Sequence, residues 1–273
     1  MNALTWTDTA TDTRPTLDDL PGTTLETVLG QAALQTRVDR KYLLAADELP
    51  GVLGGVDGGL AVLRIGERQG FGYHSTYFDT PDLEAFRLAG QGRRRRFKVR
   101  TRVYRDSGDA WLEVKTRGQR GATVKDRTPY ELADAGRLTP AARAFVARTL
   151  DERGVDGVDV AELVPALHTS YVRTTLLLTD PGATSRATVD TGLVWRRPWT
   201  ETALSVPDQV IVETKGGTVP SSLDRALWRA GFRPGRISKY GAGLAALDDD
   251  LPSLKWHRLL NQRLQTDPGS SPG

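Results

Sequence analysis

The stretch of sequence that decides the fold is Phe97-Lys98-Val99-Arg100-Thr101-Arg102-Val103-Tyr104. In a β-strand, alternate side chains point to the same face. One face is therefore basic and the other apolar, with Lys98, Arg100, Arg102 and Tyr104 set against Phe97, Val99 and Val103. The apolar face needs a cover, and the basic face must meet either solvent or a polar interior.

The same alternation returns in several other strand-like segments. The charged sets are Arg37, Asp39 and Lys41; Glu113, Lys115 and Arg117; Arg186, Thr188 and Asp190; and Glu213 with Lys215. A sheet with one solvated face would explain any single set. Taken together, the sets mix closely spaced Lys and Arg with a carboxylate, whereas solvated sheet faces commonly carry Thr, Ser and Gln. Strands whose charged faces line a central tunnel, with helices covering the apolar faces, are the second interpretation.

Strand signals dominate the middle of the chain and indicate a mainly β (α+β) protein. The predicted strands are 37–44, 60–66, 70–78, 94–105, 109–117, 122–132, 167–178, 186–196 and 208–215. The predicted helices are 139–150, 221–230, 23–35, 81–89 and 250–261. Strands joined mostly by short turns favour an antiparallel barrel or a sandwich, and a closed barrel leaves no exposed edges. We expect one domain over residues 23–261, with disordered tails at 1–22 and 262–273.

Composition narrows the possible functions. The 273 residues contain no cysteine and three histidines, so thiolate chemistry is excluded and a His-rich metal site is not expected. Any metal would be a hard cation held by carboxylates. The net charge of +3 argues against a general nucleic-acid binder. No apolar run reaches the roughly 18 residues that span a bilayer, and no signal peptide is evident, so a cytoplasmic location is expected.

A tunnel lined with Lys and Arg would suit a multiply charged anion. Buried cations cost several kcal/mol each unless they are paired or solvated. Arg binds phosphate oxygens in a bidentate manner and Lys acts as a point charge. Interspersed Asp and Glu suit a divalent cation that bridges phosphate oxygens. The pattern therefore predicts a metal–triphosphate or polyphosphate ligand.

Eight short motifs, in order along residues 35–247, are similar to a known family. They are Arg-Val-Asp-Arg-Lys-Tyr (37–42), Tyr-Phe-Asp-Thr-Pro-Asp-Leu (77–83), Val-Arg-Thr-Arg-Val-Tyr (99–104), Leu-Glu-Val-Lys-Thr (112–116), Tyr-Val-Arg-Thr (171–174), Val-Asp-Thr (189–191), Val-Glu-Thr-Lys (212–215) and Ser-Lys-Tyr (238–240). Through them the chain resembles the catalytic domain of the vacuolar transporter chaperone (VTC) polyphosphate polymerases, within the triphosphate tunnel metalloenzymes. The resemblance implies an eight-stranded tunnel in which the ATP γ-phosphoryl group is transferred to a growing polyphosphate chain with Mn²⁺ or Mg²⁺.

The resemblance also implies roles for single residues. Lys41, Arg100, Arg102, Lys115 and Lys239 would contact phosphates as catalytic residues, and Arg186 would join them. Arg173, Lys215 and Lys98 complete the expected phosphate-binding set. Glu213 is the expected metal ligand, with Glu113, Asp190 and Asp39 as supporting carboxylates. Because phosphoryl transfer needs alignment and neutralised oxygens rather than covalent help, no nucleophile is assigned.

The sequence departs from the related hydrolases and cyclases at the first motif. Those enzymes begin with Glu-x-Glu-x-Lys, and here Arg37 replaces the first Glu, which favours the polymerase branch. A metal-dependent triphosphate hydrolase, with water oriented by a carboxylate such as Glu113, remains the first alternative. A non-catalytic polyphosphate-binding module is the second. The chain shows no regulatory SPX-type domain and no membrane segment, so a separate membrane partner could receive a product.

Three features have a structural interpretation beside a functional one. Residues 93–96 (Arg-Arg-Arg-Arg) are expected to form a solvated patch at an entrance, where they could also steer polyanions inward. Trp195 and Trp199 could stack an adenine ring, although packing against the sheet is the favoured interpretation. His74 and His168 are expected to be structural.

Overall fold

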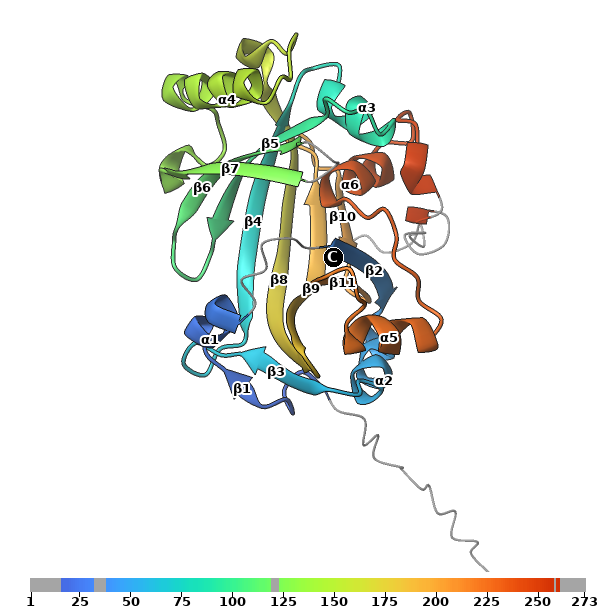
Figure 1. Ribbon diagram of the computed structural model, residues 1–273. Coiled ribbons are helices and arrows are strands. Elements are labelled where there is room, and N and C mark those ends of the chain that lie inside the picture. The colour runs from blue at the N-terminus through green and yellow to red at the C-terminus, as the bar shows by residue number, and fades with distance from the viewer. Residues whose placement is uncertain (1–15, 32–37, 119–122, 258, 261–273) are drawn as a thin grey trace, which may run out of the picture.

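The computed structural model describes residues 16–31, 38–118, 123–257 and 259–260 (Figure 1). Its strands are β1 (Gly22–Thr23), β2 (Val38–Ala45), β3 (Gly59–Leu63), β4 (Gly70–Asp79), β5 (Phe97–Tyr104), β6 (Ala110–Arg117), β7 (Thr123–Tyr130), β8 (Val164–Asp180), β9 (Ala183–Arg196), β10 (Ala203–Val206) and β11 (Gln209–Gly216). Its α-helices are α1 (Leu25–Gln31), α2 (Leu49–Gly54), α3 (Glu84–Gly90), α4 (Pro140–Glu152), α5 (Ser222–Arg229) and α6 (Lys239–Leu247).

Eight strands follow one another in a single path, in the order β2-β11-β9-β8-β4-β5-β6-β7. Every neighbouring pair along this path is antiparallel. The short strands β1, β3 and β10 pair beside the path. Within the described residues β2 and β7 are its two ends and do not pair with each other. The mainly antiparallel sheet is therefore confirmed and the closed barrel is not.

The apolar strand faces lie under helices, as the tunnel interpretation requires. Val99, Leu112 and Val114 are fully buried in one hydrophobic cluster that also holds residues of α3, α4 and α6. Tyr42 and Val212 are fully buried in a second cluster that includes residues of α2 and α5. Figure 1 shows α3, α6 and α5 along one flank of the long strands and α4 at one end. The opposite faces of these strands therefore point away from the helices.

Local sequence signals explain the helices that were predicted. Thr139 caps α4 by accepting a hydrogen bond from the backbone NH of Ala142 (3.2 Å), and Pro140 occupies the first helical position. Ser221 and Asp224 form a capping box at the start of α5. Of the predicted helix 250–261, residues 254–257 and 259–260 are helical.

Helix α6 escaped prediction because its sequence, Lys-Tyr-Gly-Ala-Gly-Leu-Ala-Ala-Leu, contains two glycines that disfavour a helix. Ser238 starts the helix by accepting a hydrogen bond from the NH of Gly241 (3.1 Å). A Cβ on Gly241 would overlap the ring of Trp256, and one on Gly243 would overlap the ring of Trp195. The glycines thus let α6 pack closely between two indoles, and this packing holds Lys239 beside β8 and β9, where its Nζ meets Asp190 and the Tyr171 ring.

Of the expected tails, residues 1–15 and 262–273 lie outside the described part of the chain. Residues 16–22 are described. Gly22 and Thr23 pair in parallel with Val62 and Leu63 of β3.

Candidate functional site

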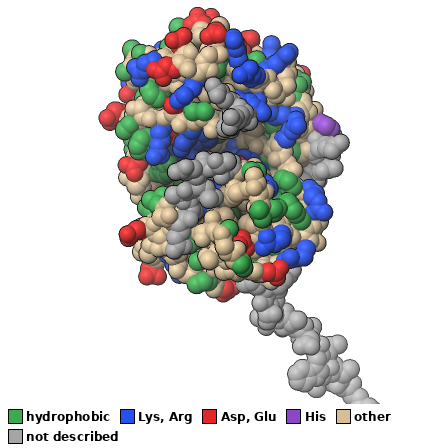
Figure 2. All heavy atoms as spheres, viewed as in Figure 1, with side chains coloured by type: hydrophobic (Ala, Val, Ile, Leu, Met, Phe, Trp, Pro, Cys, Tyr) green, Lys and Arg blue, Asp and Glu red, His purple; other side chains and the backbone are tan. Residues whose placement is uncertain are grey.

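The inward-facing side chains surround a cavity of about 560 Å³. The described residues that line it include eleven Lys and Arg side chains: Lys41, Lys98, Arg100, Arg102, Lys115, Lys125, Arg127, Arg173, Arg186, Lys215 and Lys239. Two lining residues carry carboxylates, Asp39 and Glu213. In Figure 2 the face toward the viewer is hollowed near its middle, with Lys and Arg side chains gathered in and around the hollow.

Strand register places the basic residues in rows across the sheet. On β5, β6 and β7, Lys98 lies opposite Lys115, and Lys115 lies opposite Lys125. Like charges in such cross-strand positions destabilise a sheet. Lys98 donates to the Ser238 hydroxyl (2.9 Å), while Lys115 forms no hydrogen bond or ion pair within the described part of the chain. Lys125 lies 3.5 Å from Glu113 Oε1, so among the described residues of this row Lys98 and Lys115 are the two that form no ion pair.

In the next row along β5 and β6, Arg100 lies opposite Glu113 and forms an ion pair with it. The Arg100 guanidinium donates through Nε to Glu113 Oε2 (2.8 Å) and through Nη1 to the Tyr77 hydroxyl (2.9 Å). Burial alone would raise the pKa of Glu113, but Arg100 and other cations outweigh burial and hold that pKa far below its usual range. Glu113 is therefore a carboxylate that fixes Arg100.

Asp190 plays the same part for two other cations. Its oxygens accept from Arg173 Nε (2.6 Å) and Nη2 (2.8 Å), and Lys239 Nζ also donates to it. The pKa of Asp190, which burial would raise, is lowered because Lys239 and Arg173 favour the ionised form. Asp190 is fully buried and Arg173 and Lys239 line the cavity, so both cations are held at its wall.

Glu213 differs from these two carboxylates because it lines the cavity itself. Lys41 donates to its Oε1, and Lys215 lies 3.2 Å from its Oε2. Burial would raise the pKa of Glu213, but Lys215 and Lys41 lower it well below the ordinary value. Glu213 is thus an ionised oxygen donor at the wall of a basic cavity.

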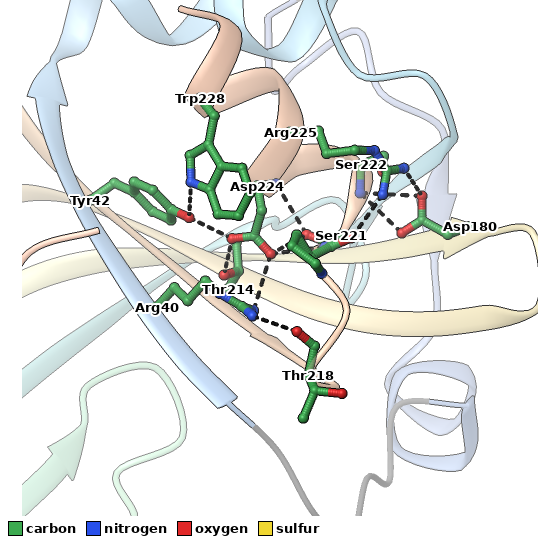
Figure 3. A network of polar contacts seen from close by, with 11 residues as sticks. Arg40, Tyr42, Asp180, Thr214, Thr218, Ser221, Ser222, Asp224, Arg225 and Trp228 are labelled. Atoms are coloured by element: carbon green, nitrogen blue, oxygen red, sulfur yellow. Dashed lines mark hydrogen bonds and ion pairs between the residues drawn. The ribbon is translucent and has the colours of Figure 1, made fainter. Parts of the chain in front are cut away.

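A network on the outer face of the same strands holds this part of the site in place (Figure 3). Lys41, Glu213 and Lys215 point inward from β2 and β11. Their neighbours Tyr42 and Thr214 point outward, and each donates to Asp224 Oδ1 over 2.7 Å.

Asp224 Oδ2 in turn accepts from the NH and the hydroxyl of Ser221, each over 2.9 Å. Sequence reasoning missed Asp224. Thr214 and Ser221 lie 10 and 3 positions from Asp224 in the sequence, but Tyr42 lies 182 positions away. No single sequence motif therefore reveals the set.

Tyrosines also line the cavity. Tyr73 stacks on Tyr171 with ring centroids 5.3 Å apart, and Arg102 donates to the Tyr171 hydroxyl (2.9 Å). The Arg173 guanidinium lies 5.2 Å from the Tyr73 centroid, within reach of a cation–π contact.

The tryptophans that could stack an adenine do not line the cavity. Trp195 is buried against α6 and donates to the Lys239 carbonyl (2.8 Å), as packing predicts. Trp199 is 90% exposed.

Eleven of the thirteen predicted site residues line the cavity. The other two, Glu113 and Asp190, lie behind the wall and bind cations that line it. Arg37 lies outside the described residues. Sequence reasoning missed Lys125 and Arg127 of β7, although Arg127 lies opposite Glu113 and over the Trp111 ring. The opposite face of β7 also carries a charged residue, Asp126, so the sequence did not show which face of this strand points to the cavity.

The family follows from a comparison of the whole sequence. The model of the VTC domain matches residues 36–248. The chain belongs to the VTC domain family. This confirms the resemblance drawn from the eight motifs. A comparison with curated proteins gives no match.

Two solved structures are similar to this VTC domain at low identity. HpAC1 from Hippeastrum, for which a dominant triphosphatase activity is described, is 15% identical with a TM-score of 0.46, over 81% of this chain and 99% of its own. The PH1819 protein from Pyrococcus horikoshii is 10% identical with a TM-score of 0.39, over 76% and 99% of the two chains. With TM-scores this low, neither likeness bears on the activity of the VTC domain described here.

A divalent cation fits this VTC domain only in a particular way. Among the described residues, no three His, Asp or Glu side chains converge as a complete cage. Mg²⁺ in phosphate-binding sites uses one or two protein carboxylates and takes its other oxygens from substrate and water. Glu213 and Asp39, on the adjacent strands β11 and β2, meet that smaller requirement.

No described helix combines the length and the apolar character needed to cross a membrane.

Proposed function

We propose that this protein is a polyphosphate polymerase that transfers the γ-phosphoryl group of ATP to the end of a polyphosphate chain inside the basic cavity. The observation that carries the proposal is the cavity lining, in which eleven cationic side chains face two carboxylates among the described residues. Membership of the VTC domain family supports the same class of substrate. So large an excess of positive charge around one cavity suits a ligand with many phosphates and few other features.

Each group of residues has a part in such a transfer. Arg100, fixed by Glu113 and Tyr77, and Arg173, fixed by Asp190, offer rigid guanidinium groups to phosphate oxygens. Lys98 and Lys115 add charge, and neither forms an ion pair with a described carboxylate. Phosphoryl transfer spreads negative charge over the oxygens of the moving group, so preorganised cations stabilise its transition state. A Mn²⁺ or Mg²⁺ ion held by Glu213 and Asp39 would add Lewis-acid neutralisation of those oxygens.

The reaction itself needs no protein nucleophile. A terminal oxygen of the acceptor polyphosphate attacks the γ-phosphorus, the bond from that phosphorus to the bridging oxygen breaks, and ADP leaves. At neutral pH this acceptor oxygen is already ionised, so no general base is required.

Water as acceptor would need a base. Glu113, the carboxylate expected to orient a water molecule, is 1% exposed and accepts from Arg100, and Glu213 is bound by two lysines. These contacts favour a phosphate acceptor over water.

One incubation tests the proposal. Purified protein is mixed with ATP and either Mn²⁺ or Mg²⁺, and the products are separated by gel electrophoresis. ADP with long polyphosphate is the expected result. Free phosphate without polymer would assign a hydrolase instead, and the absence of turnover would leave a binding module. Glu213→Ala, and Arg100→Ala combined with Arg102→Ala, are expected to abolish polymer.

Lys115→Met is the sharpest variant for this test. Lys115 forms no hydrogen bond or ion pair with a described residue, so Lys115→Met breaks no such interaction in the described part of the fold. A fall in turnover of about a hundredfold or more is expected, because a cation at the transferring phosphate is lost. Arg148→Met is the matched control, since Arg148 lies on α4 with its side chain 65% exposed and does not line the cavity. Unchanged turnover in Lys115→Met would remove Lys115 from the site.

A further inference from the structure

Asp79 is a fully buried carboxylate at the end of β4, and it forms no ion pair with a described residue. Its Oδ1 accepts from the backbone NH groups of Thr80 and Ala85, each over 2.8 Å, and its Oδ2 accepts from the NH of Phe86 (2.9 Å). These three donors lie in the connection from β4 into α3, so a local structural role accounts for them. The fourth donor is the hydroxyl of Tyr240, which lies 161 positions away in the sequence and which a local role does not need.

Tyr240 lies in the first turn of α6, directly after a residue that lines the cavity. It is 1% exposed and does not line the cavity itself. Its neighbour Lys239 does line the cavity and donates to Asp190. Ser238, which precedes Lys239 and starts the helix, accepts from Lys98 (2.9 Å), a second lining cation. The place of this first turn therefore decides where Lys239 lies and what Lys98 contacts.

The ring of Tyr240 has a separate contact with the wall of the cavity. It stacks on Tyr77 with ring centroids 5.0 Å apart. The Tyr77 hydroxyl in turn accepts from Arg100 (2.9 Å). The ring and the hydroxyl of Tyr240 thus act on different parts of the site, and Tyr240→Phe removes only the contact of the hydroxyl.

Helix α6 depends on tertiary contacts for its position, because its two glycines weaken it. Apolar packing against the indole rings has no preferred direction, whereas a hydrogen bond requires one. Two such directional contacts reach the first turn from outside the helix. Trp195 donates to the Lys239 carbonyl (2.8 Å), and Tyr240 donates to Asp79. The second ends on an acceptor that three backbone NH groups hold in place.

The protonation of the two partners suits this hydrogen bond. Burial raises the pKa of Asp79, and the hydrogen bond from Tyr240 is the largest of the contacts that act against burial. Burial raises the pKa of Tyr240 well above its ordinary value, and Asp79 raises it further. The hydroxyl therefore keeps its proton and donates.

We propose that Tyr240 is a positioning residue for phosphate binding and acts through Lys239. Its hydrogen bond to Asp79 fixes the first turn of α6, so that the Lys239 ammonium is held at the cavity wall. The proposal rests on the proposed function, because it takes the cavity as the place where phosphates bind. A merely structural Tyr240 would hold α6 against the sheet, and its effect on phosphate binding would not depend on Lys239.

A double-mutant cycle tests this dependence. The variants are Tyr240→Phe, Lys239→Met and their combination, and binding of inorganic tripolyphosphate is measured by titration calorimetry without ATP. Tyr240→Phe alone is expected to weaken binding on the order of fivefold, within the range of coupling between residues in contact. In the Lys239→Met background the same change is expected to have no further effect.

Tyr130→Phe is the matched control, because it removes the same atom from a tyrosine that does not line the cavity. The Tyr130 hydroxyl donates to the carbonyl of Arg137 (2.9 Å) and accepts from the NH of Thr139 (3.1 Å). Tyr130→Phe therefore loses two hydrogen bonds of the fold. It is expected to bind tripolyphosphate as the unaltered protein does, and urea denaturation shows how far each variant is destabilised.

A measurement without ligand shows whether the Lys239 amine itself is held. Trace acetylation with acetic anhydride, followed by mass spectrometry of the peptides, gives the reactivity of Lys239 relative to Lys41 in the same sample. Lys41 is the internal reference because it also donates to a carboxylate and lies on β2 rather than on α6. Tyr240→Phe is expected to raise the relative reactivity of Lys239 about threefold, because a charge-assisted hydrogen bond that is weakened releases the amine more often. Tyr130→Phe should leave it unchanged.

Several outcomes would overturn the proposal. They are an unchanged affinity in Tyr240→Phe, additive losses in the combined variant, and equal losses in Tyr240→Phe and Tyr130→Phe. If Tyr240→Phe did not fold while Tyr130→Phe did, Tyr240 would be a structural residue. Failure of the unaltered protein to bind tripolyphosphate would count against the proposed function instead. The relative reactivity of Lys239 would then still decide whether Tyr240 positions it, and an unchanged reactivity would mean that it does not.

Discussion

Lys98 and Lys115 face each other across β5 and β6, and their protonation is the most informative property of the site at the scale of single residues. Burial lowers the pKa of Lys98 to about 7, with Lys255 and Arg100 acting in the same direction. Nearby Arg100 lowers the pKa of Lys115 well below its ordinary value, and burial adds to this. Both lysines thus hold their protons weakly in the empty site, and a bound phosphate would favour the charged forms.

Phosphate affinity should therefore depend on pH through Lys98. As the pH rises from about 6 to about 9, Lys98 loses its proton in the empty protein, and binding must then include proton uptake. At about pH 6 the unaltered protein should bind tripolyphosphate roughly tenfold more tightly than Lys98→Met, the worth of one charge-assisted hydrogen bond. The gap should narrow at about pH 9. Titration calorimetry of both proteins measures it, and the ionisation of the ligand cancels in the comparison.

The pH dependence of stability has the opposite sign. In the unfolded chain Lys98 keeps its proton up to its ordinary pKa of 10.5, while in the folded protein it loses the proton near 7. Between these values the unfolded state binds more protons, so the contribution of Lys98 to stability rises with pH over that window. The affinity measurement of the preceding paragraph also has an outcome that would contradict the lowered pKa of Lys98. In that outcome, the difference in tripolyphosphate affinity between the unaltered protein and Lys98→Met stays constant across the pH range.

At the scale of elements, Asp224 of α5 binds side chains on the outer faces of both β2 and β11. Its carboxylate is fully buried and accepts from Tyr42, Thr214 and Ser221. Asp224→Ala should lower the free energy of unfolding by roughly 3 kcal/mol, because several buried donors lose their acceptor together. It should also weaken phosphate binding, since Lys41 and Glu213 alternate with these anchored residues. Urea denaturation and calorimetry measure the two effects.

Asp57→Ala is the control for this prediction. Asp57 also forms an ion pair with an arginine, Arg229 (2.8 Å), but the Asp57 side chain is 71% exposed. Asp57→Ala should therefore lower the free energy of unfolding by less than about 1 kcal/mol. If Asp224→Ala reduced stability while phosphate affinity stayed unchanged, the network would hold the fold without positioning the site.

The elements also show what sequence alone could and could not provide. Alternation is a local signal with a period of two, so the residues themselves are enough to identify the inward faces of β2, β5, β6, β9 and β11. Alternation could not show whether β2 and β7 meet, because closure depends on the whole path of strands. It also could not separate lining carboxylates from supporting ones: Glu113 and Glu213 share one Glu-x-Lys pattern, yet only Glu213 lines the cavity.

At the scale of the whole molecule, the basic interior should reduce stability in the absence of ligand. In the part of the chain that the structure describes, eleven lining cations face two carboxylates, and only part of their charge is balanced by Glu113, Asp190 and Glu213. Lys115→Met removes one unbalanced charge, so the ligand-free variant should melt at a higher temperature than the unaltered protein. Tripolyphosphate at about 100 times its Kd should stabilise the unaltered protein by roughly 2.7 kcal/mol.

Lys115→Met should have the higher melting temperature without ligand, and the unaltered protein should show the larger rise in melting temperature with tripolyphosphate. For a protein of this size that stabilisation corresponds to a rise in Tm of about 5–10 °C. Lys115→Met should start higher and gain less at the same ligand concentration, because it binds phosphate more weakly. Thermal melts with and without tripolyphosphate measure both quantities, and Arg148→Met should behave like the unaltered protein. If ligand-free Lys115→Met melted at a lower temperature than the unaltered protein, Lys115 would stabilise the fold. The lysine row would then have a structural role and would not be an anion-binding site.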